Sequence, residues 1–157
     1  MRIPAKADYA IRALVELAAL TADNANAKPV PADRLAENQQ IAAPFLAGIL
    51  GQLRLAGLVR SVRGPEGGYQ LARSAKEITI ADVIRAIDGP LATLSSGQYP
   101  DALEYPGSAV MLRDVWVAVR ASMRLVLEHT TIADVASGKL PAAVRKLIAD
   151  EDAWLRR

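Results

Sequence analysis

The chain has 157 residues, 52% of them hydrophobic, and a net charge of +2, so it can bury one substantial core and is not a strongly basic polyanion binder. It has no cysteine and one histidine, His129, which excludes disulfides, thiolate metal sites and most imidazole-based metal or triad chemistry. No apolar run reaches the roughly 18 residues of a membrane span, and the start MRIPAKADYA has no hydrophobic signal core, so we expect a cytoplasmic protein without a membrane partner.

Helical periodicity predicts a first helix over residues 5–22, with Tyr9 and Leu14 on its apolar face. Arg2 and Lys6 stand at or before the start of this helix, where a cation opposes the helix dipole. Because this placement gains nothing for folding, a phosphate partner is one explanation, and an unpaired surface charge is the other.

A helix-turn-helix is predicted next. A polar loop over residues 23–30 leads to a short helix from Pro31 or Ala32 through Ala36, and residues 38–40 form the turn. The second helix covers residues 43–56, with Pro44 in its first turn and Gly57 as its stop signal. Its predicted buried stripe consists of Phe45, Leu46, Ile49, Leu50 and Leu53.

A hairpin over residues 58–71 follows, which makes the unit a winged helix in outline. Residues 58–63 alternate like a strand, the glycine-rich segment 64–68 supplies a turn, and Tyr69 begins the return strand. Arg60 and Arg63 flank the tip, and residues 38–65 contain three arginines and no acid. This pattern favours specific duplex DNA binding; the alternative is an ordinary helix–hairpin fragment with solvated arginines.

The rest of the chain is predicted to be helical around one loop. A capping box at Thr79 and Asp82 starts a helix that ends near Ile87, and residues 91–108 form an irregular loop. The longest helix is predicted over residues 110–129. It carries a heptad seam of apolar residues: Leu112, Trp116, Val119, Met123 and Val126. We interpret this seam as an intermolecular contact, although it could instead pack on its own domain.

The predicted C-terminal part is a short helix and a last helix. A second capping box at Thr131 and Asp134 starts the short helix, Gly138 stops it, and the last helix covers residues 141–155. Tyr99, Tyr105 and Trp116 could line an organic-ligand pocket or cover the long helix, and we favour the covering role because aromatic residues beside a long helix usually belong to a core.

Several of these segments together resemble a known family. The segments KADYAIRALVELA, LRLAGLVRSVRGPEGGYQLAR, EITIADVIRAIDGPL and TTIADV occur in the order found in the Rrf-two family of bacterial winged-helix transcription regulators. The resemblance implies a mainly α fold with a small β-hairpin: a winged helix-turn-helix domain (1–89), an irregular loop (90–108), and a dimerisation helix with C-terminal helices (109–157).

By this resemblance the protein is a homodimer that binds double-stranded DNA at a palindromic operator. The helix over residues 43–56 would enter the major groove, the wing tip would reach the minor groove, and Arg2 and Lys6 would lie near the DNA backbone. The candidate DNA-binding residues are Arg2, Lys6, Pro44, Ala47, Gly48, Gln52, Arg54, Arg60, Arg63, Gly64 and Gly67.

The chain departs from the family in its missing cysteines. Cluster-binding members carry three cysteines in the loop before the long helix, and this chain has none, so we expect no iron–sulfur cluster, no other cofactor and no metal site. We interpret His129 as a favourable cation at a helix end and not as a ligand.

The second departure is a recognition helix poor in base-reading side chains. Its outer face consists of Pro44, Ala47, Gly48, Gly51 and Leu55. One hypothesis is a close approach of the helix backbone to DNA, with Ala47 on a thymine methyl, Gln52 and Arg54 at the margins, and specificity from the wing and DNA shape. The competing hypothesis is that the two glycines make room for another helix and that DNA affinity is weak.

The leading prediction is therefore a homodimeric DNA-binding transcription regulator, expected to be a repressor and to respond to an unknown small-molecule effector. The sequence itself does not distinguish repression from activation. The alternative is a protein-interaction or adaptor module with weakened DNA binding. An enzyme is not expected, because the sequence has no phosphate loop, no Ser/His/Asp set and no metal-ligand spacing.

Overall fold

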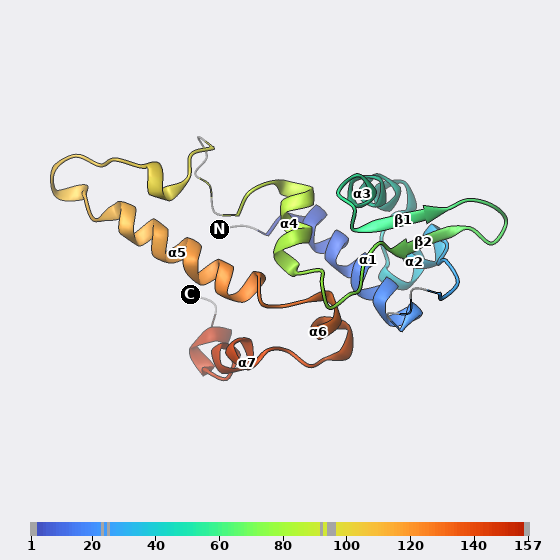
Figure 1. The fold of residues 1–157 in the computed structure, drawn as a ribbon. Helices are drawn as coiled ribbons and strands as arrows, with labels where there is room; N and C mark the ends of the chain where they lie inside the picture. The colour runs from blue at the N-terminus through green and yellow to red at the C-terminus, as the bar shows by residue number, and fades with distance from the viewer. Residues whose placement is uncertain (1–2, 23, 25, 92, 94–96, 156–157) are drawn as a thin grey trace.

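The computed structural model describes residues 3–22, 24, 26–91, 93 and 97–155. Figure 1 shows a compact body of helices and one hairpin, from which a long helix, α5, extends. The elements are α1 (Ala5–Thr21), α2 (Ala32–Gln39), α3 (Ala43–Leu55), β1 (Val59–Val62), β2 (Gly68–Leu71), α4 (Ile80–Asp88), η1 (Pro100–Ala102), η2 (Gly107–Ala109), α5 (Leu112–Leu127), α6 (Ile132–Ser137), α7 (Ala142–Ile148) and η3 (Glu151–Trp154). The predicted class, mainly helical with a small hairpin, is confirmed.

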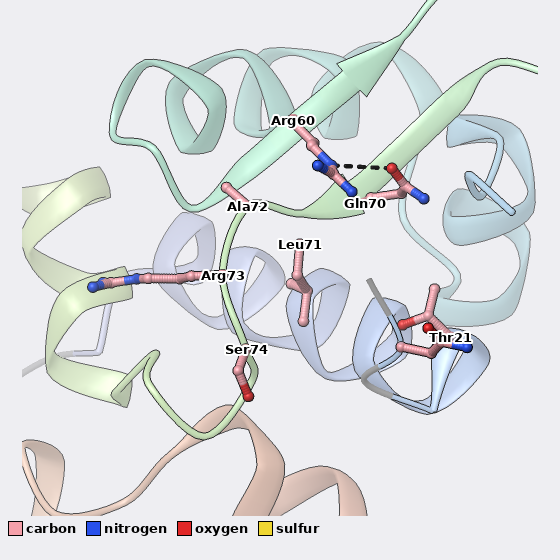
Figure 2. A pocket seen from close by; sticks show the side chains of 8 residues that line it. Thr21, Arg60, Gln70, Leu71, Ala72, Arg73 and Ser74 are labelled. Atoms are coloured by element: carbon pink, nitrogen blue, oxygen red, sulfur yellow. Dashed lines mark hydrogen bonds between the residues drawn. The ribbon is translucent and has the colours of Figure 1, made fainter. Parts of the chain in front are cut away.

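The hairpin pairs β1 and β2 antiparallel, with Val59 opposite Leu71 and Arg60 opposite Gln70. Figure 2 shows the cross-strand pair in which Arg60 Nε donates to Gln70 Oε1 at 3.1 Å. On its other edge β2 is joined to the segment before α2, because Val30 and Tyr69 exchange backbone hydrogen bonds of 2.9 and 2.8 Å. The base of the wing is thereby tied to the helix-turn-helix.

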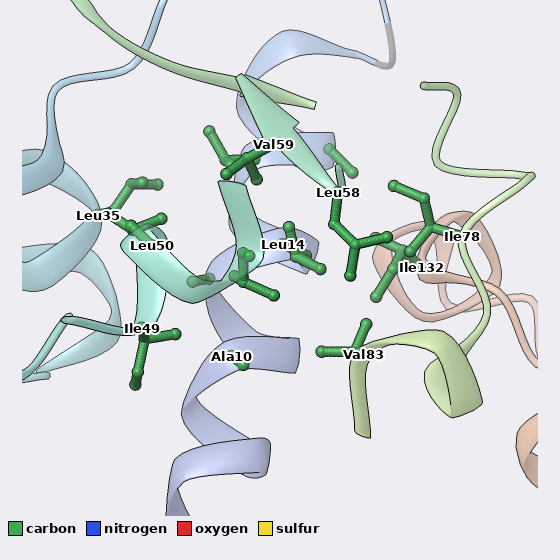
Figure 3. Packing of buried hydrophobic residues seen from close by; sticks show 14 of the residues in the cluster. Ala10, Leu14, Leu35, Ile49, Leu50, Leu58, Val59, Ile78, Val83 and Ile132 are labelled. Carbon is green, nitrogen blue, oxygen red and sulfur yellow. The ribbon is translucent and has the colours of Figure 1, made fainter. Parts of the chain in front are cut away.

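The core lies around α1, which packs against α2, α3, α4, α6 and β2. Figure 3 shows side chains of these elements meeting in one cluster, among them the fully buried Leu14, Leu50 and Ile132. Leu46, Ile49, Leu50 and Leu53 form the buried stripe of α3 as predicted. Phe45 does not belong to this stripe: it is 43% exposed, because it lies at the edge of the stripe.

Two copies of the segment Thr-Ile-Ala-Asp-Val open α4 and α6, and each forms the predicted capping box, at Thr79 with Asp82 and at Thr131 with Asp134. The two threonines form an antiparallel bridge, so α6 is fixed against the start of α4. Although α6 belongs to the predicted segment 109–157, its Ile132 is buried in the core of the winged unit. The three-part division of the chain itself stays a prediction.

Three predicted elements need correction. Helix α2 continues through Gln39, because the Asn38 and Gln39 amides each donate at 2.7 Å to the carboxylate of Glu16 on α1 instead of forming a turn. The loop after α4 contains η1 and η2. The last helix ends at Ile148 and η3 follows, because the Asp150 side chain accepts from the Asp152 N–H at 3.0 Å and starts a new turn.

The prediction that the dimer-seam helix is the longest is also wrong. Helix α5 has 16 residues, and α1 has 17. Helix α5 begins two residues later than predicted, after η2, and no side chain caps its first turn. Within the described residues, no helix is long and apolar enough to cross a membrane.

Candidate nucleic-acid interface

The outer face of α3 is smooth and uncovered. Pro44, Ala47 and Gly48 are exposed, and Gly51 is half-buried. A Cβ atom built on Gly48 or Gly51 would meet nothing within 4 Å. Neither glycine therefore makes room for another part of the described chain, although each costs the helix about 0.8–1 kcal/mol relative to alanine. No contact with the described residues explains them, whereas the close approach of an outside molecule would.

The polar residues of α3 lie at the margins of this smooth face. Arg54 is exposed and makes no hydrogen bond or ion pair with the described residues. The Gln52 Oε1 atom is buried and has no hydrogen-bond partner among the described residues, so this amide oxygen points into the protein. Gln52 and Arg54 were both predicted to contact bases from the margins of this face. Only Arg54 presents its head group to solvent.

A cluster of aromatic and polar side chains fixes the start of α3 against α1. The rings of Tyr9 and Phe45 meet edge to face with centroids 5.6 Å apart, and the Arg12 guanidinium lies 5.1 Å from the Tyr9 centroid. Arg12 also donates to the Gln39 Oε1 atom at 3.3 Å and to the Gln39 carbonyl oxygen. The apolar periodicity of α3 predicted a buried Phe45; its position at one edge of the stripe is the signal that could have shown its exposure.

Arg60 lies at the base of the wing beside a small cavity of about 140 Å³. Figure 2 shows Arg60 and Gln70 on the hairpin, Thr21 at the end of α1 across from them, and Arg73 extended toward α4. Arg73 forms an ion pair with Asp82 of α4 at 3.1 Å, and Gln70 donates to the Ala27 carbonyl oxygen. Arg60 is exposed, and its Nε is held by Gln70 at the root of the hairpin.

Arg63 occupies a different position, directly after β1 at the tip. It is exposed and makes no hydrogen bond or ion pair with the described residues. Arg60 lies within β1 and bonds to Gln70, whereas Arg63 lies beyond the end of the strand. The two wing arginines of the sequence analysis are thus not equivalent.

The two predicted tip glycines have different structural roles. Gly64 has φ +113° and open space at its Cβ position, so its backbone can be approached from outside. A Cβ on Gly67 would lie 2.4 Å from the Val62 carbonyl oxygen, so the turn itself requires glycine there. An exposed ion pair between Lys28 and Glu66, 3.5 Å apart, adds a cation beside the tip that the sequence analysis did not single out.

The N-terminal cations are described only in part. Lys6 lies in the first turn of α1, is half-buried, and makes no hydrogen bond or ion pair with the described residues. Arg2 lies outside the described residues. The predicted contact of this end with the DNA backbone stays a prediction.

Helix α5 is mostly uncovered, and none of its residues is buried. Leu112, Trp116 and Val119 of the predicted seam are 36%, 38% and 40% exposed, while Met123 and Val126 are half-buried near the body. Val115 and Leu125 add further exposed apolar surface at 51% and 53%. An apolar face of this length has no partner among the described residues.

The loop before α5 returns along this helix. The Arg120 guanidinium lies 5.3 Å from the Tyr99 ring centroid and 2.5 Å from an oxygen of Asp101. A hydrogen bond from its own backbone N–H and another from Arg120 hold the pKa of Asp101 below its usual range. Tyr99 thus contacts α5, as expected if this loop covers the long helix. Tyr105 is half-buried.

At its other end α5 is tied to α4. Glu128 pairs with Arg85 of α4 and accepts from Arg124 Nε at 3.1 Å. The hydrogen bond from Arg85 is the main reason that the pKa of Glu128 lies below its usual value of 4.5. His129 Nδ1 donates to the Leu125 carbonyl oxygen at 3.1 Å, so the imidazole lies at the C-terminal end of the helix as predicted.

Comparison with known proteins identifies the family of this chain. The model of the Rrf2 family, described as an iron-dependent transcriptional regulator, matches residues 3–138. The chain belongs to the Rrf2 family of transcription regulators. It is 53% identical over 150 residues to Rv1287 of Mycobacterium tuberculosis, named as an HTH-type transcriptional regulator, covering 96% of this chain and 90% of that protein.

Solved structures agree with this membership. CymR (YrzC), the global cysteine regulator of Bacillus subtilis, superposes with a TM-score of 0.73 at 30% identity, covering 88% of this chain and 98% of CymR. T. potens IscR superposes with a TM-score of 0.69 at 29% identity, covering 100% of this chain and 93% of IscR. The winged-helix fold predicted for the chain is therefore that of the Rrf2 family.

The iron in the family description can be tested against the donors that this chain offers. The chain contains no cysteine, and its one histidine donates to a backbone carbonyl. Across the described residues, no three histidine, cysteine or acidic side chains gather in a way that could hold a metal ion. These residues do not fit a cysteine-ligated iron site.

Proposed function

We propose that this chain is a homodimeric transcription regulator that binds a palindromic DNA operator through α3 and the wing, without an iron–sulfur cluster. The observation that carries the proposal is the uncovered face of α3 together with an exposed Arg63 at the wing tip, in a chain of the Rrf2 family. A face without Cβ atoms at Gly48 and Gly51 can approach DNA closely, and arginine is favoured in a narrow minor groove.

In the proposed complex, positively charged side chains position the protein on DNA, and apolar contacts together with DNA shape provide sequence specificity. Lys6, Arg54 and Arg63 would contact the phosphate backbone or the minor groove. Pro44 and Ala47 would contact the base edges by apolar contact, for which the thymine methyl is the complementary group. Gln52 would join the readout only after its amide rotates outward, because its Oε1 atom is buried. Arg60 would act mainly by holding the root of the wing.

The proposed dimer pairs the seam of α5 with that of a second copy. The exposed Leu112, Trp116 and Val119 supply the apolar surface that such a pairing would bury. One winged unit per half-site then follows from two-fold symmetry. Repression of transcription, a cytoplasmic location and the absence of enzymatic activity complete the proposal; relatives named as transcription regulators support the last of these.

Selection of binding sites from random duplexes with the purified protein tests this function. We expect an enriched palindrome whose affinity falls steeply with salt, because several phosphates are contacted. A selection without any enriched palindrome would overturn the proposal.

The alternative is an adaptor that uses the exposed faces of α5, and of Leu147 and Trp154 near the C-terminus, to bind proteins. That function predicts weak DNA affinity without sequence preference. The same selection therefore separates the two functions.

A further inference from the structure

A second, larger cavity lies away from the proposed DNA face, between the N-terminal segment, α1, α4 and α5. Its volume is about 650 Å³, within the range of roughly 300–1,000 Å³ typical of small-molecule sites. Most of its lining is apolar, including Ile11, Ile80, Ile84, Leu91, Met123 and Leu127. A molecule that fills it must therefore have a substantial apolar body.

The charged groups that line this cavity are both negative. Two carboxylates, Asp8 and Asp88, line it together with the hydroxyls of Thr93 and Ser122, and no lysine or arginine is among the described lining residues. Asp8 has a cation nearby, since Arg12 lies 3.7 Å away on the next turn of α1. Asp88 has none: it makes no hydrogen bond or ion pair with the described residues.

Asp88 is also the last residue of α4, where the helix dipole adds partial negative charge. Asp88 is exposed and lines the cavity. Among the described residues the negative charge of Asp88 therefore has no ion-pair partner, and a positive group placed beside it in the cavity would supply one.

We infer that this cavity binds an organic ammonium compound with an apolar body, with the ammonium at Asp88 and the apolar body against Ile84, Leu91 and Met123. A metal ion does not fit, because the described residues gather no third ligand beside the two carboxylates. An anionic amphiphile does not fit either, because it would place a second negative charge against Asp88.

The position of the cavity connects the ligand to regulation. Ile11 lies on α1, which supports α3, whereas Met123 and Val126 lie on α5 within the predicted dimer seam. A ligand in contact with both helices sets how α5 leaves the winged body, and so sets the spacing of the two DNA-binding units. This regulatory step rests on the function proposed above; the binding step does not.

Calorimetric titration of the full chain at neutral pH with octylamine, octanol and octanoate tests the binding step, because these probes share one apolar chain and differ in charge. We expect octylammonium to bind at least about tenfold more tightly than octanoate. In Asp88→Asn this preference should fall several-fold while octanol binding stays unchanged. Asp33→Asn, which removes an exposed acid of α2 outside the cavity, should bind all three probes as the wild type does.

Several results would overturn the inference. Octanoate binding as tightly as octylamine, an unchanged preference in Asp88→Asn, or no binding by any probe would each do so. Binding that is absent in the wild type but present in a monomeric variant, Val119→Glu, would assign the cavity to a segment of a second copy. Because no DNA is present in these titrations, failure of the inference remains distinguishable from failure of the proposed function.

Discussion

The winged body and α5 bury their apolar residues in opposite ways. In the body, Leu14, Leu50 and Ile132 are completely buried within one chain. In α5 no residue is buried, and Val115 and Val119 remain about half exposed. The body therefore contains its own source of stability, whereas α5 presents a surface whose burial requires a second molecule. This difference suggests that folding and assembly are encoded by separate sets of leucines and valines.

The largest expected effect is on the stability of the winged body, which should depend on its own buried core. Leu14→Ala should lower the free energy of unfolding by about 3–4 kcal/mol, because it leaves a cavity in the fully buried cluster. Leu125→Ala, the same change on exposed α5, should cost less than about 1 kcal/mol. Urea unfolding followed by circular dichroism measures both. Equal losses of unfolding free energy in the two variants would contradict the claim that the body is stabilised by its own core and α5 is not.

The second test breaks the proposed α5 pairing. Val119→Glu should raise the dimer dissociation constant at least about a hundredfold, because it would bury an unpaired carboxylate in the seam. The circular dichroism spectrum should not change. Ala121→Glu, exposed and on the opposite side of α5, is the matched control and should leave the dimer intact. Sedimentation velocity gives the masses, and a dimeric Val119→Glu protein would show that the seam does not form the dimer contact.

The third test separates the two wing arginines. Arg63→Ala should weaken operator binding by about tenfold to a hundredfold and reduce the salt slope by about one, since its exposed guanidinium is available to DNA. Arg60→Ala should have a smaller effect on affinity, because Arg60 is engaged with Gln70 at the base of the hairpin. Anisotropy titrations over a salt series measure both. Unchanged binding in the double variant would exclude a wing-centred mode of recognition.

A fourth test concerns the smooth face of α3. Gly48→Ala should stabilise the fold by up to about 1 kcal/mol, since its Cβ meets open space and alanine favours the helix. The same methyl should weaken operator binding several-fold if the DNA backbone approaches this face. Thermal unfolding and anisotropy on one preparation provide the two readouts. A variant that is more stable and binds DNA equally well would show that the face is not in close contact.

The smallest effect is a pH dependence at the junction of α4 and α5. The pKa of Glu128 is lowered below 4.5 mainly by Arg85, so its ion pair contributes stability above that pH and loses it as the pH falls through the lowered folded-state value. Acid unfolding of Glu128→Gln should therefore show a weaker pH dependence below about 4.5 than the wild type. Identical acid profiles would mean that this contact does not couple the two regions.

Much of this fold could be predicted from local patterns. The repeated capping boxes, the glycine stop at Gly138 and the buried stripe of α3 each depend on a few neighbouring residues, and they agree with the structure except at Phe45. The errors came from contacts distant in sequence. Glu16 extends α2 by binding Asn38 and Gln39, 22 and 23 residues away, and no local rule includes such a partner.

The candidate site was less predictable than the fold. Spacing alone made Arg60 and Arg63 look equivalent, and both are exposed, but the β1–β2 register places Arg60 opposite Gln70, to which its Nε donates. The open space around Gly48 depends on what surrounds α3, which the sequence does not state. The cavity with Asp88 was also missed, because its walls come from segments that are distant in sequence.

The most direct test of the account compares a selected operator with a copy in which one half-site is scrambled. If two winged units held by α5 act together, the wild type should bind the complete operator at least about a hundredfold more tightly than the half-site. Val119→Glu should bind the two duplexes with similarly weak affinity. Equal affinity of the wild type for the complete operator and the half-site would contradict the central claim that α5 assembles the DNA-binding units.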